Sequence, residues 1–319
     1  MILLIQYTLI YASCLILVAL GGMFSEHSGV INIGLEGIMV IGALGGALTM
    51  MAMPEGAAPY AVVLLTVLMS AVAGVVFSML LSVAAINFKA DQTLVGTAMN
   101  ILATAVAAVV VKAINTSTSG GNNVSAIVRY IEEHEAFILR WHFGEKSIFE
   151  FNWFFVITAV ALVVSYVVLY KTKFGLRLYA CGEHPHAADA AGVNVTKMRY
   201  AGVMISGVLG GIGGLVYIAS ANSSWDFKYG VAGAGFLALA VMIFGEWKPW
   251  KIAGAAIIFG LFRALSNVYT AFPLLTELKI PSNVYNMLPY IISLLVLAFT
   301  SKRSRAPKAE GIPFDKGQR

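Results

Sequence analysis

The chain has 319 residues, of which 59% are hydrophobic and 12% are charged, and it contains 31 glycines. Soluble domains carry about 25% charged residues, so this composition argues against a soluble protein and indicates a polytopic membrane protein. The net charge of +5 is not gathered in one patch, which makes nucleic-acid binding a poor interpretation.

Nine apolar segments approach or exceed the roughly 20 residues that a helix needs to cross a bilayer. They are residues 3–22, 33–53, 60–86, 93–113, 152–170, 199–220, 231–246, 252–272 and 284–300. The seventh is short and rich in glycine at its start, and the third is long enough to tilt. The expected fold class is therefore all-α, a membrane helix bundle of about nine transmembrane helices.

Lysines and arginines between these segments orient the bundle. If the residues after 300 are cytoplasmic, 14 basic residues fall on the cytoplasmic side and 6 outside, while Arg263 lies within a span. The positive-inside rule then places the N-terminus outside and the C-terminus in the cytoplasm. We expect a transmembrane domain over residues 1–300 and a basic, disordered cytoplasmic tail over 301–319.

The first polar interruption is "GGMFSEHSGVINIGLEG", residues 21–37. It places Glu26, His27, Asn32 and Glu36 among five glycines, between two apolar runs. One interpretation is a simple cytoplasmic loop. The other is a helix discontinuity along a transport path, because irregular backbone at membrane depth must be surrounded by protein or by a water-filled cavity.

Polar side chains form a stripe on span four and another on span eight. They are Thr93, Thr97, Asn100 and Thr104 on the first, and Arg263, Ser266 and Asn267 on the second, each set on one helical face. A charge facing lipid costs several kcal/mol, so Arg263 should face protein or water. Each stripe is either a set of interhelical hydrogen bonds or a polar pore wall.

The longest expected outer loop is residues 114–150. It begins with the turn-rich run "NTSTSGGNN" and continues with apolar residues at Ile127, Tyr130, Ile131 and Ile138, which suggest an amphipathic helix at the interface. This loop is a connector lying on the membrane or a docking surface for an extracytoplasmic partner. In span six, Gly207/Gly211 and Gly210/Gly214 are expected to be close-packing glycines.

Residues 171–198 form a hydrophilic segment between spans five and six. Within it, "HPHAADAAG" indicates a short helix, since Pro185 suits a first helical turn, the alanines favour helix and Gly192 suits the position after its end. At about 10 Å, such a helix is too short to be stable alone. A second helix should start near Asn194 or Thr196.

Three interpretations of this segment stay open: a plain loop, a metal site formed by Cys181, His184 and His186, or a docking helix for a cytoplasmic partner. The chain contains no G-x-x-x-x-G-K-[ST] loop, no H-E-x-x-H motif and no convincing Ser/His/Asp set. We therefore expect no enzymatic activity in this chain. If it performs uphill transport, nucleotide hydrolysis belongs to another subunit.

Two stretches carry a resemblance to a known family. "TKFGLRLYACGEHPHAADAAGVNVTKMRYAGVMISGVLGGIGG", residues 172–214, resembles the signature of ABC importer permeases of the branched-chain amino acid, ribose and nucleoside group. "SGVINIGLEGIMVIGA", residues 28–43, resembles the second motif of that group, in a form closest to the shorter permease subunit of bacterial nucleoside (guanosine-type) uptake systems. The resemblance covers almost the whole chain.

The resemblance implies a type II importer permease in a bacterial plasma membrane. In that family the polar segment holds a coupling helix that sits in a groove of a cytoplasmic ATPase. The residues that match it are Glu183, His184, Pro185, His186, Ala187, Ala188, Asp189 and Ala191. It also implies a second homologous permease and an extracytoplasmic substrate-binding lipoprotein. This chain would bind no cofactor or metal, because ATP and Mg²⁺ are used by the ATPase.

The candidate residues for a nucleoside pathway are Asn32, Glu36, Thr97, Asn100 and Asn267, with Trp225 and Phe227 as a gate or a contact for the binding protein. Aromatic rings and amides suit a nucleobase, although they also suit interface anchoring. Two alternatives remain open. The same machinery could import a sugar or a branched-chain amino acid, or the chain could be an ATP-independent secondary transporter.

Overall fold

The computed structural model describes residues 2–54, 56–119, 134–143, 147–220, 230–272, 282–300 and 306–317. The helices are α1 (Ile2–His27), α2 (Leu35–Ala52), α3 (Pro59–Ser82, continued by the π-helix η1, Val83–Asn87), α4 (Gln92–Ser119), α6 (Trp153–Lys171), α7 (Lys173–Glu183), α8 (Pro185–Ala190), α9 (Val195–Ser220), α10 (Ala234–Phe244), α11 (Pro249–Val268) and α13 (Ser282–Thr300). Two short 3₁₀ turns (η2, His134–Phe137; η4, Tyr269–Ala271) and two strands (β1, Ile138–Phe143; β2, Ser147–Asn152) complete the described elements.

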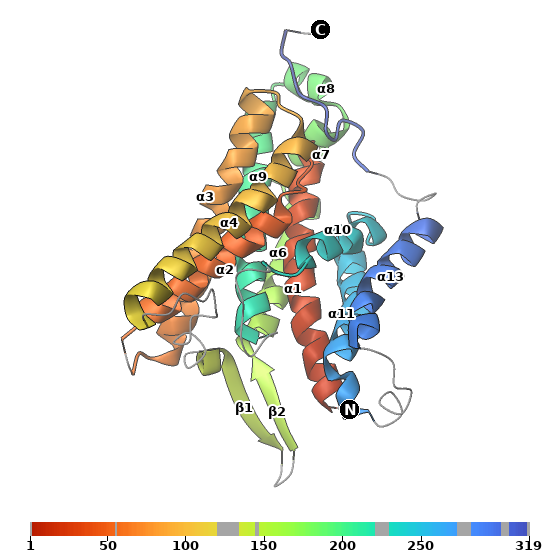
Figure 1. The fold of residues 1–319 in the computed structure, drawn as a ribbon. Coiled ribbons are helices and arrows are strands. Elements are labelled where there is room, and N and C mark those ends of the chain that lie inside the picture. The colour runs from red at the N-terminus through yellow and green to blue at the C-terminus, as the bar shows by residue number, and fades with distance from the viewer. Residues whose placement is uncertain are drawn as a thin grey trace.

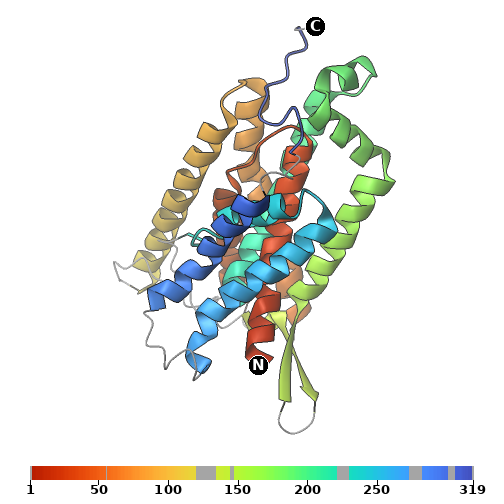
Figure 2. The same cartoon turned by 90° about the vertical axis from the view of Figure 1, so that its right-hand side faces the viewer.

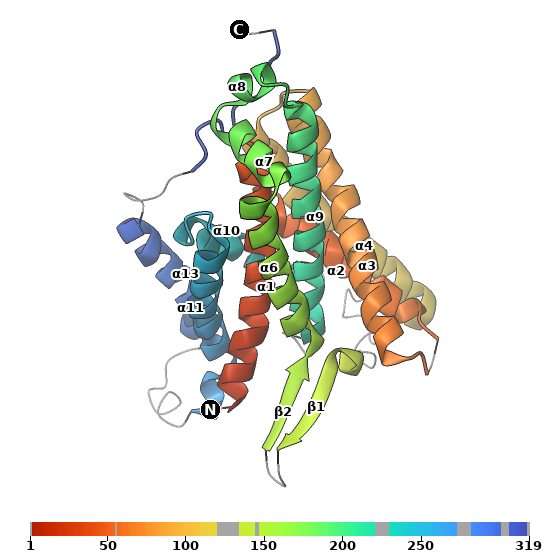
Figure 3. The same cartoon turned by 180° about the vertical axis from the view of Figure 1, so that it is seen from behind.

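Most of the long helices run between two ends of the bundle, with α8 at one end and the strands at the other, whereas the short α10 lies across them (Figures 1 and 3). We call these the α8 end and the hairpin end. The N-terminus lies toward the hairpin end and the C-terminus at the α8 end (Figures 1 and 2). The two described ends of the chain therefore lie at opposite ends of the bundle.

Among the helices that the structure describes, seven are long and apolar enough to cross a membrane: α1, α2, α3 with η1, α4, α6, α9 and α11. Several of them turn large apolar side chains outward; Leu64 on α3 is 69% exposed and Leu94 on α4 is 71% exposed. Water disfavours such extended apolar faces, whereas lipid or a protein partner accepts them. The chain is a multi-pass integral membrane protein.

Two helices, α1 and α9, form the centre of the bundle. α1 is buried almost continuously from Ile10 to His27 and packs against α9, α10 and α11. On α9, a Cβ added to Gly211 would overlap the Ser70 carbonyl oxygen of α3, and one added to Gly214 would overlap the Met39 carbonyl oxygen of α2. These contacts confirm the predicted close-packing glycines.

The expected seventh span, 231–246, is wrong as a full transmembrane helix. α10 covers only Ala234–Phe244, 11 residues, or about 16 Å at 1.5 Å per residue, which is too short to cross alone. It begins after Gly233, whose φ of +78° ends any continuous helix on that side. The ninth expected span coincides with α13, and the remaining seven coincide with the membrane-length helices.

The outer loop also differs from the expectation. α4 continues to Ser119, so residues 114–119 are helical, and β1 and β2 pair antiparallel with Ile138 opposite Asn152. Residues 138–143 are therefore a strand and not part of an amphipathic helix, whereas Ile127, Tyr130 and Ile131 lie outside the described residues. The missed signal is the alternation of polar and apolar residues in "ILRWHF" and "SIFEFN", which is typical of a hairpin.

The C-terminal tail was expected to be disordered, and over 306–317 this is wrong. Ala309 N donates to Gly182 O over 2.8 Å, and Gly311 N donates to Gly29 O over 3.2 Å. Phe314 packs against a small apolar cluster of Cys181, Ala188 and Val195. Composition alone predicts a solvated tail, but its backbone and its one aromatic residue find partners at the α8 end.

Candidate functional site

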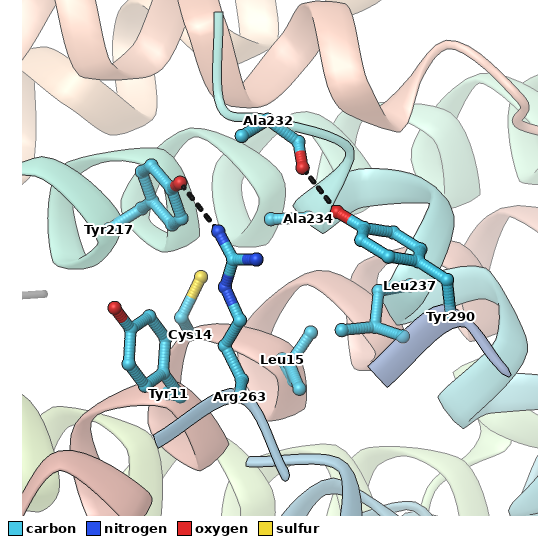
Figure 4. Close-up of a pocket in the computed structure, with 9 residues that line it drawn as sticks. All are labelled: Tyr11, Cys14, Leu15, Tyr217, Ala232, Ala234, Leu237, Arg263 and Tyr290. Atoms are coloured by element: carbon cyan, nitrogen blue, oxygen red, sulfur yellow. Dashed lines mark hydrogen bonds between the residues drawn. The ribbon is translucent and has the colours of Figure 1, made fainter. Parts of the chain in front are cut away.

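A cationic side chain lies inside the helix bundle, among tyrosines. Arg263 of α11 donates from Nη2 to the Tyr217 hydroxyl over 3.4 Å, and its Cζ lies 5.9 Å from the centre of the Tyr11 ring. Figure 4 shows the guanidinium pointing toward Tyr217, with Tyr11 and Cys14 beside it. This confirms that Arg263 faces protein, as the cost of a lipid-facing charge requires.

A small cavity lies beside this guanidinium. Its volume is about 10 Å³, close to the least that holds one water molecule. It is lined by Tyr11, Cys14, Leu15, Tyr217, Ala232, Ala234, Leu237, Arg263 and Tyr290 (Figure 4). Sites for drug-sized ligands have volumes of about 300–1,000 Å³, so a nucleoside does not fit here without movement of the surrounding helices.

Asn267 and Tyr290 extend this polar cluster. The exposed Asn267 amide donates to the Tyr11 hydroxyl, and the Tyr290 hydroxyl donates to Ala232 O over 2.5 Å. Sequence reasoning named Asn267 but missed the three tyrosines. They come from α1, α9 and α13, and no sequence spacing connects them with Arg263.

Glu36 holds the start of α10. Its two carboxylate oxygens accept hydrogen bonds from Gly233 N over 2.8 Å and from Gly235 N over 2.7 Å. The first N–H groups of a helix have no partner within the helix, and a carboxylate at this position satisfies them and opposes the positive end of the helix dipole. Glu36 thus joins the beginning of α2 to the short helix α10.

Asn32 and Asn100 make hydrogen bonds that hold the non-helical residues 28–34 between α1 and α2 in place. Asn100 Oδ1 accepts from Gly37 N over 2.8 Å, and its Nδ2 donates to Ile33 O over 3.0 Å. Gln92 Oε1 accepts from Ile31 N over 2.7 Å, and Asn32 Nδ2 donates to the Ser206 hydroxyl over 2.9 Å. Most of this segment is buried, so it is a discontinuity enclosed by protein and not a simple loop.

The remaining pathway candidates are placed less centrally. Thr97 is exposed on α4, where its hydroxyl donates to Thr93 O of the same helix over 2.8 Å. Trp225 and Phe227 lie outside the described residues. The structure therefore brings Asn32, Glu36 and Asn100 together around the discontinuity, and it groups Asn267 with the Arg263 cluster.

At the α8 end, the short polar helix has the predicted form. α8 runs from Pro185 to Ala190, with the proline in its first turn, and Gly192 follows with φ +81°. Pro185 and Ala188 are buried, whereas His184, Ala187 and Ala191 are exposed. Asn194 Oδ1 accepts from Lys197 N over 2.9 Å and caps α9, which confirms the second predicted helix start.

Sequence reasoning missed the helix α7 that precedes α8. Thr172 caps it, since its hydroxyl oxygen accepts from Gly175 N over 3.2 Å. Its buried residues Gly175, Leu178 and Cys181 recur every three positions on one face. The signal was available as a Thr N-cap directly after the fifth apolar run. Through α7, the exposed helix α8 is joined to the end of α6.

A polar groove lies beside α8. Its volume is about 770 Å³, and it is lined by residues from the end of α8, the start of α9 and the C-terminal tail. Charged residues of both signs line it: Lys89, Asp189, Lys197, Asp315 and Lys316. Burial raises the pKa of the nearby Cys181 thiol to about 11, so Cys181 is not a reactive thiolate near pH 7.

Comparison with known proteins gives consistent results. Residues 4–297 match the family described as the permease component of branched-chain amino acid transport systems. The chain is 40% identical to the guanosine ABC transporter permease protein NupQ of Bacillus subtilis, over 98% of this chain and 96% of that one. It is 37% identical to the nucleoside ABC transporter permease protein NupC of Lactococcus lactis, over 97% and 96%.

More distant matches bear on the fold and on related permeases. The same Lactococcus strain has a second nucleoside ABC transporter permease protein, NupB, which is 24% identical over 60% of this chain and 51% of its own length. Among solved structures, an inward-facing putative metal-chelate type ABC transporter matches with a TM-score of 0.51 and 15% identity, over 93% of this chain and 85% of that one. At this identity, the likeness concerns the fold alone.

Proposed function

The chain belongs to the family of permease components of branched-chain amino acid transport systems, and from this premise we propose that it is a permease subunit of an ABC importer that takes up nucleosides. Two relatives that match nearly its whole length at 40% and 37% identity are named as guanosine and nucleoside permeases, which supports this cargo. The expected signature and the family match agree.

The observation that carries the proposal is the shape of the α8 end. α8 is held on its buried face by Pro185 and Ala188 and presents His184, Ala187 and Ala191 to the outside. A six-residue helix is not stable alone, so a braced and exposed one is a preformed contact surface. We infer that α7 and α8 form the coupling segment for a cytoplasmic ATPase, which binds ATP and Mg²⁺ and performs the hydrolysis.

The other partners follow from the same assignment. The α8 end is then cytoplasmic, and the hairpin end faces a substrate-binding lipoprotein outside the plasma membrane of a bacterial cell. One Lactococcus strain contains two permease proteins related to this chain, which supports pairing with a second, homologous permease. Exposed apolar faces on α3 and α4 are available for lipid or for that permease.

We assign the pathway to two polar groups of this chain. Asn32, Glu36 and Asn100 keep the broken backbone between α1 and α2 and the start of α10 in place, so they shape the path. Arg263, Asn267 and the tyrosines near them offer hydrogen-bond donors and aromatic faces that suit a nucleobase. The cavity of about 10 Å³ implies that nucleoside passage requires helix movement.

Replacing Ala187 by aspartate tests the proposal in the assembled importer. Ala187 is exposed on α8, so Ala187→Asp should leave the chain folded but disturb ATPase docking. Uptake of radiolabelled guanosine into proteoliposomes should fall about tenfold or more. ATP hydrolysis should no longer be coupled to guanosine uptake. Thr196→Asp, at an exposed position in the first turn of α9, is the matched control and should transport normally.

Two results would overturn this function. Guanosine uptake that continues in vesicles without ATP, driven by an ion gradient, would favour a secondary transporter. If excess leucine or ribose blocks guanosine uptake but excess adenosine or uridine does not, the proposed nucleoside specificity is wrong.

A further inference from the structure

The C-terminal residues 306–317 connect parts of the chain that are far apart in sequence. The two backbone hydrogen bonds from Ala309 to Gly182 and from Gly311 to Gly29 join the tail to the end of α7 and to the turn after α1. A Cβ added to Gly182 would overlap the His27 carbonyl oxygen, so α7 and α1 already touch at this point. The tail therefore lies across a three-way junction (Figure 1).

A pair of carboxyl groups lies at this junction. Glu310 of the tail is hydrogen-bonded to Glu26 of α1, and the Trp247 indole N–H donates to Glu26 Oε2 over 2.5 Å. Glu26 is buried and Glu310 is partly buried. Two carboxylates at hydrogen-bonding distance repel each other when both are charged, whereas one shared proton turns the repulsion into a hydrogen bond.

Side chains of tail residues 314–316 contact α8 and the turn after η1. The Phe314 and His186 rings lie 5.2 Å apart, Lys316 Nζ lies 3.8 Å from Asp189 Oδ1, and Lys89 Nζ lies 2.7 Å from Asp315 Oδ2. The two ion pairs are largely exposed, so each contributes little to the free energy that holds the tail in place. The specific attachment is therefore the backbone contacts, Phe314 and the carboxyl pair.

We propose that residues 306–317 form a clamp that fixes the coupling segment α7–α8 to the end of α1 and the turn after it, and that its closure requires one proton shared by Glu26 and Glu310. Glu310 is then a positioning residue, acting through the contacts of the tail. This inference rests on the proposed function, because that function assigns α7–α8 as the segment that contacts the ATPase. The closure of the tail itself does not depend on which substrate is transported.

The direction of the pH effect follows from the burial of Glu310. Burial raises its pKa from 4.5 to about 7, so the closed clamp binds a proton more tightly than the free tail does. The contribution of the shared proton to closure is then full below pH 4.5 and is lost as the pH rises toward and through 7. Between pH 5.5 and pH 8.5 the closure constant should fall roughly 30-fold, with little further change above that range.

Among the described residues, no cation contacts Glu26 or Glu310, so none neutralises the pair in place of the proton. His27 Nε2 lies 3.2 Å from Trp247 O, and its ring lies against Tyr179, 4.1 Å between centroids. The buried Arg199 guanidinium faces Gly29 and Cys181. The other charged groups around the tail are exposed or partly exposed ones: Lys89, Glu246, Lys248, Lys251, Lys308, Asp189, Asp315 and Lys316.

The distance between two spin labels measures closure directly. Labels go on Ile312→Cys in the tail and Thr196→Cys on α9, both exposed positions, in the assembled importer. Both native cysteines are buried, which keeps them from the label. The distance distribution should be narrow at pH 5.5 and broad at pH 8.5.

Three variants at two positions separate the shared proton from general effects. Glu310→Gln should give a narrow distribution at both pH values, because the amide donates to an ionised Glu26 without a bound proton. Glu310→Ala should give a broad one at both. Lys308→Gln changes a charge on the exposed side of the same segment and should follow the parent protein.

A distribution that stays narrow from pH 5.5 to 8.5 in both the parent and Glu310→Ala would overturn the shared-proton closure, and a broad distribution at both pH values in the parent would overturn the clamp itself. The positioning role is tested separately by ATP hydrolysis and uptake: Glu310→Ala should loosen their coupling several-fold, and Glu310→Gln should restore it. Unchanged coupling with an open tail would overturn that role. If the tail closes as described but no nucleoside is transported, the proposed function fails and the clamp stands.

Discussion

At Gly211, three helices come so close together that no side chain fits between them. A Cβ at this position would overlap the Ser70 carbonyl oxygen, and it would lie 3.2 Å from the Cα of Gly74 on α3. A Cβ on Gly42 of α2 would in turn overlap Gly211 itself. In lipid, helices associate through close packing and not through the hydrophobic effect, so this contact sets how α2, α3 and α9 assemble.

Gly211→Ala should destabilise the protein by about 1–3 kcal/mol, the usual cost of overpacking. Thermal unfolding of the purified protein in detergent measures this as a lower midpoint temperature. Gly254→Ala on α11 is the matched control, because an added Cβ there meets nothing within 4 Å. That variant should be unchanged or slightly stabilised, since alanine favours helix over glycine by about 1 kcal/mol. Equal losses in both variants would contradict the packing argument.

At the scale of the element, α10 is a short helix whose first turn depends on a side chain of another helix. Glu36 supplies both acceptors for Gly233 N and Gly235 N. In a lipid environment an N–H group without a partner is costly, so the carboxylate makes a half-length helix possible inside the bundle. The sequence showed Gly-rich residues before α10, but not that a glutamate about 200 positions earlier would complete its start.

Glu36→Ala should destabilise the protein by about 1–3 kcal/mol, because buried N–H groups lose their acceptor. Glu36→Gln keeps one acceptor oxygen and should lose less. Differential scanning fluorimetry ranks the two, and guanosine uptake shows whether α10 supports transport. Glu246→Gln, which removes only exposed ion pairs with Lys248 and Lys251, should leave the unfolding temperature nearly unchanged. A Gln variant as unstable as the Ala variant would mean that Glu36 acts through its charge and not through two hydrogen bonds.

At the scale of the whole molecule, the two ends of the bundle have different characters. The α8 end gathers α7, α8 and the C-terminal clamp, and the hairpin end carries the N-terminus and β1–β2 (Figure 2). The excess of lysine and arginine at the α8 end predicts that it faces the cytoplasm. The α8 surface can meet an ATPase only in that orientation.

Labelling of single cysteines with a membrane-impermeant maleimide tests this orientation. Trp153→Cys, next to the hairpin, should react in intact cells, whereas Ile312→Cys in the tail should react only after the cells are permeabilised. Both positions are exposed, with Trp153 at 43% and Ile312 at 56%, so the contrast reports the side of the membrane and not burial. Labelling of Ile312→Cys in intact cells would invert the topology and remove the basis for ATPase docking.

Much of the candidate site was visible in the sequence as residue type but not as arrangement. Asn32, Glu36 and Asn100 stood out because amides and carboxylates are costly in apolar surroundings. Their hydrogen bonds to Ser206, Gly233 and Gly37 were not predictable, because the partners are backbone groups or a hydroxyl on other elements. The tyrosines near Arg263 gave no signal, since tyrosine is common in membrane helices for other reasons.

The sequence by itself determined the membrane class, the placement of nearly all long helices and the capped helix α8. These features depend on apolar run length, basic residues and local turn residues, all of which act over a few positions. Tertiary structure alone decided that α10 is short and that the tail packs against α7 and α8. Such features depend on contacts like Glu36 with Gly233 and Lys89 with Asp315, 197 and 226 positions apart, which no local pattern records.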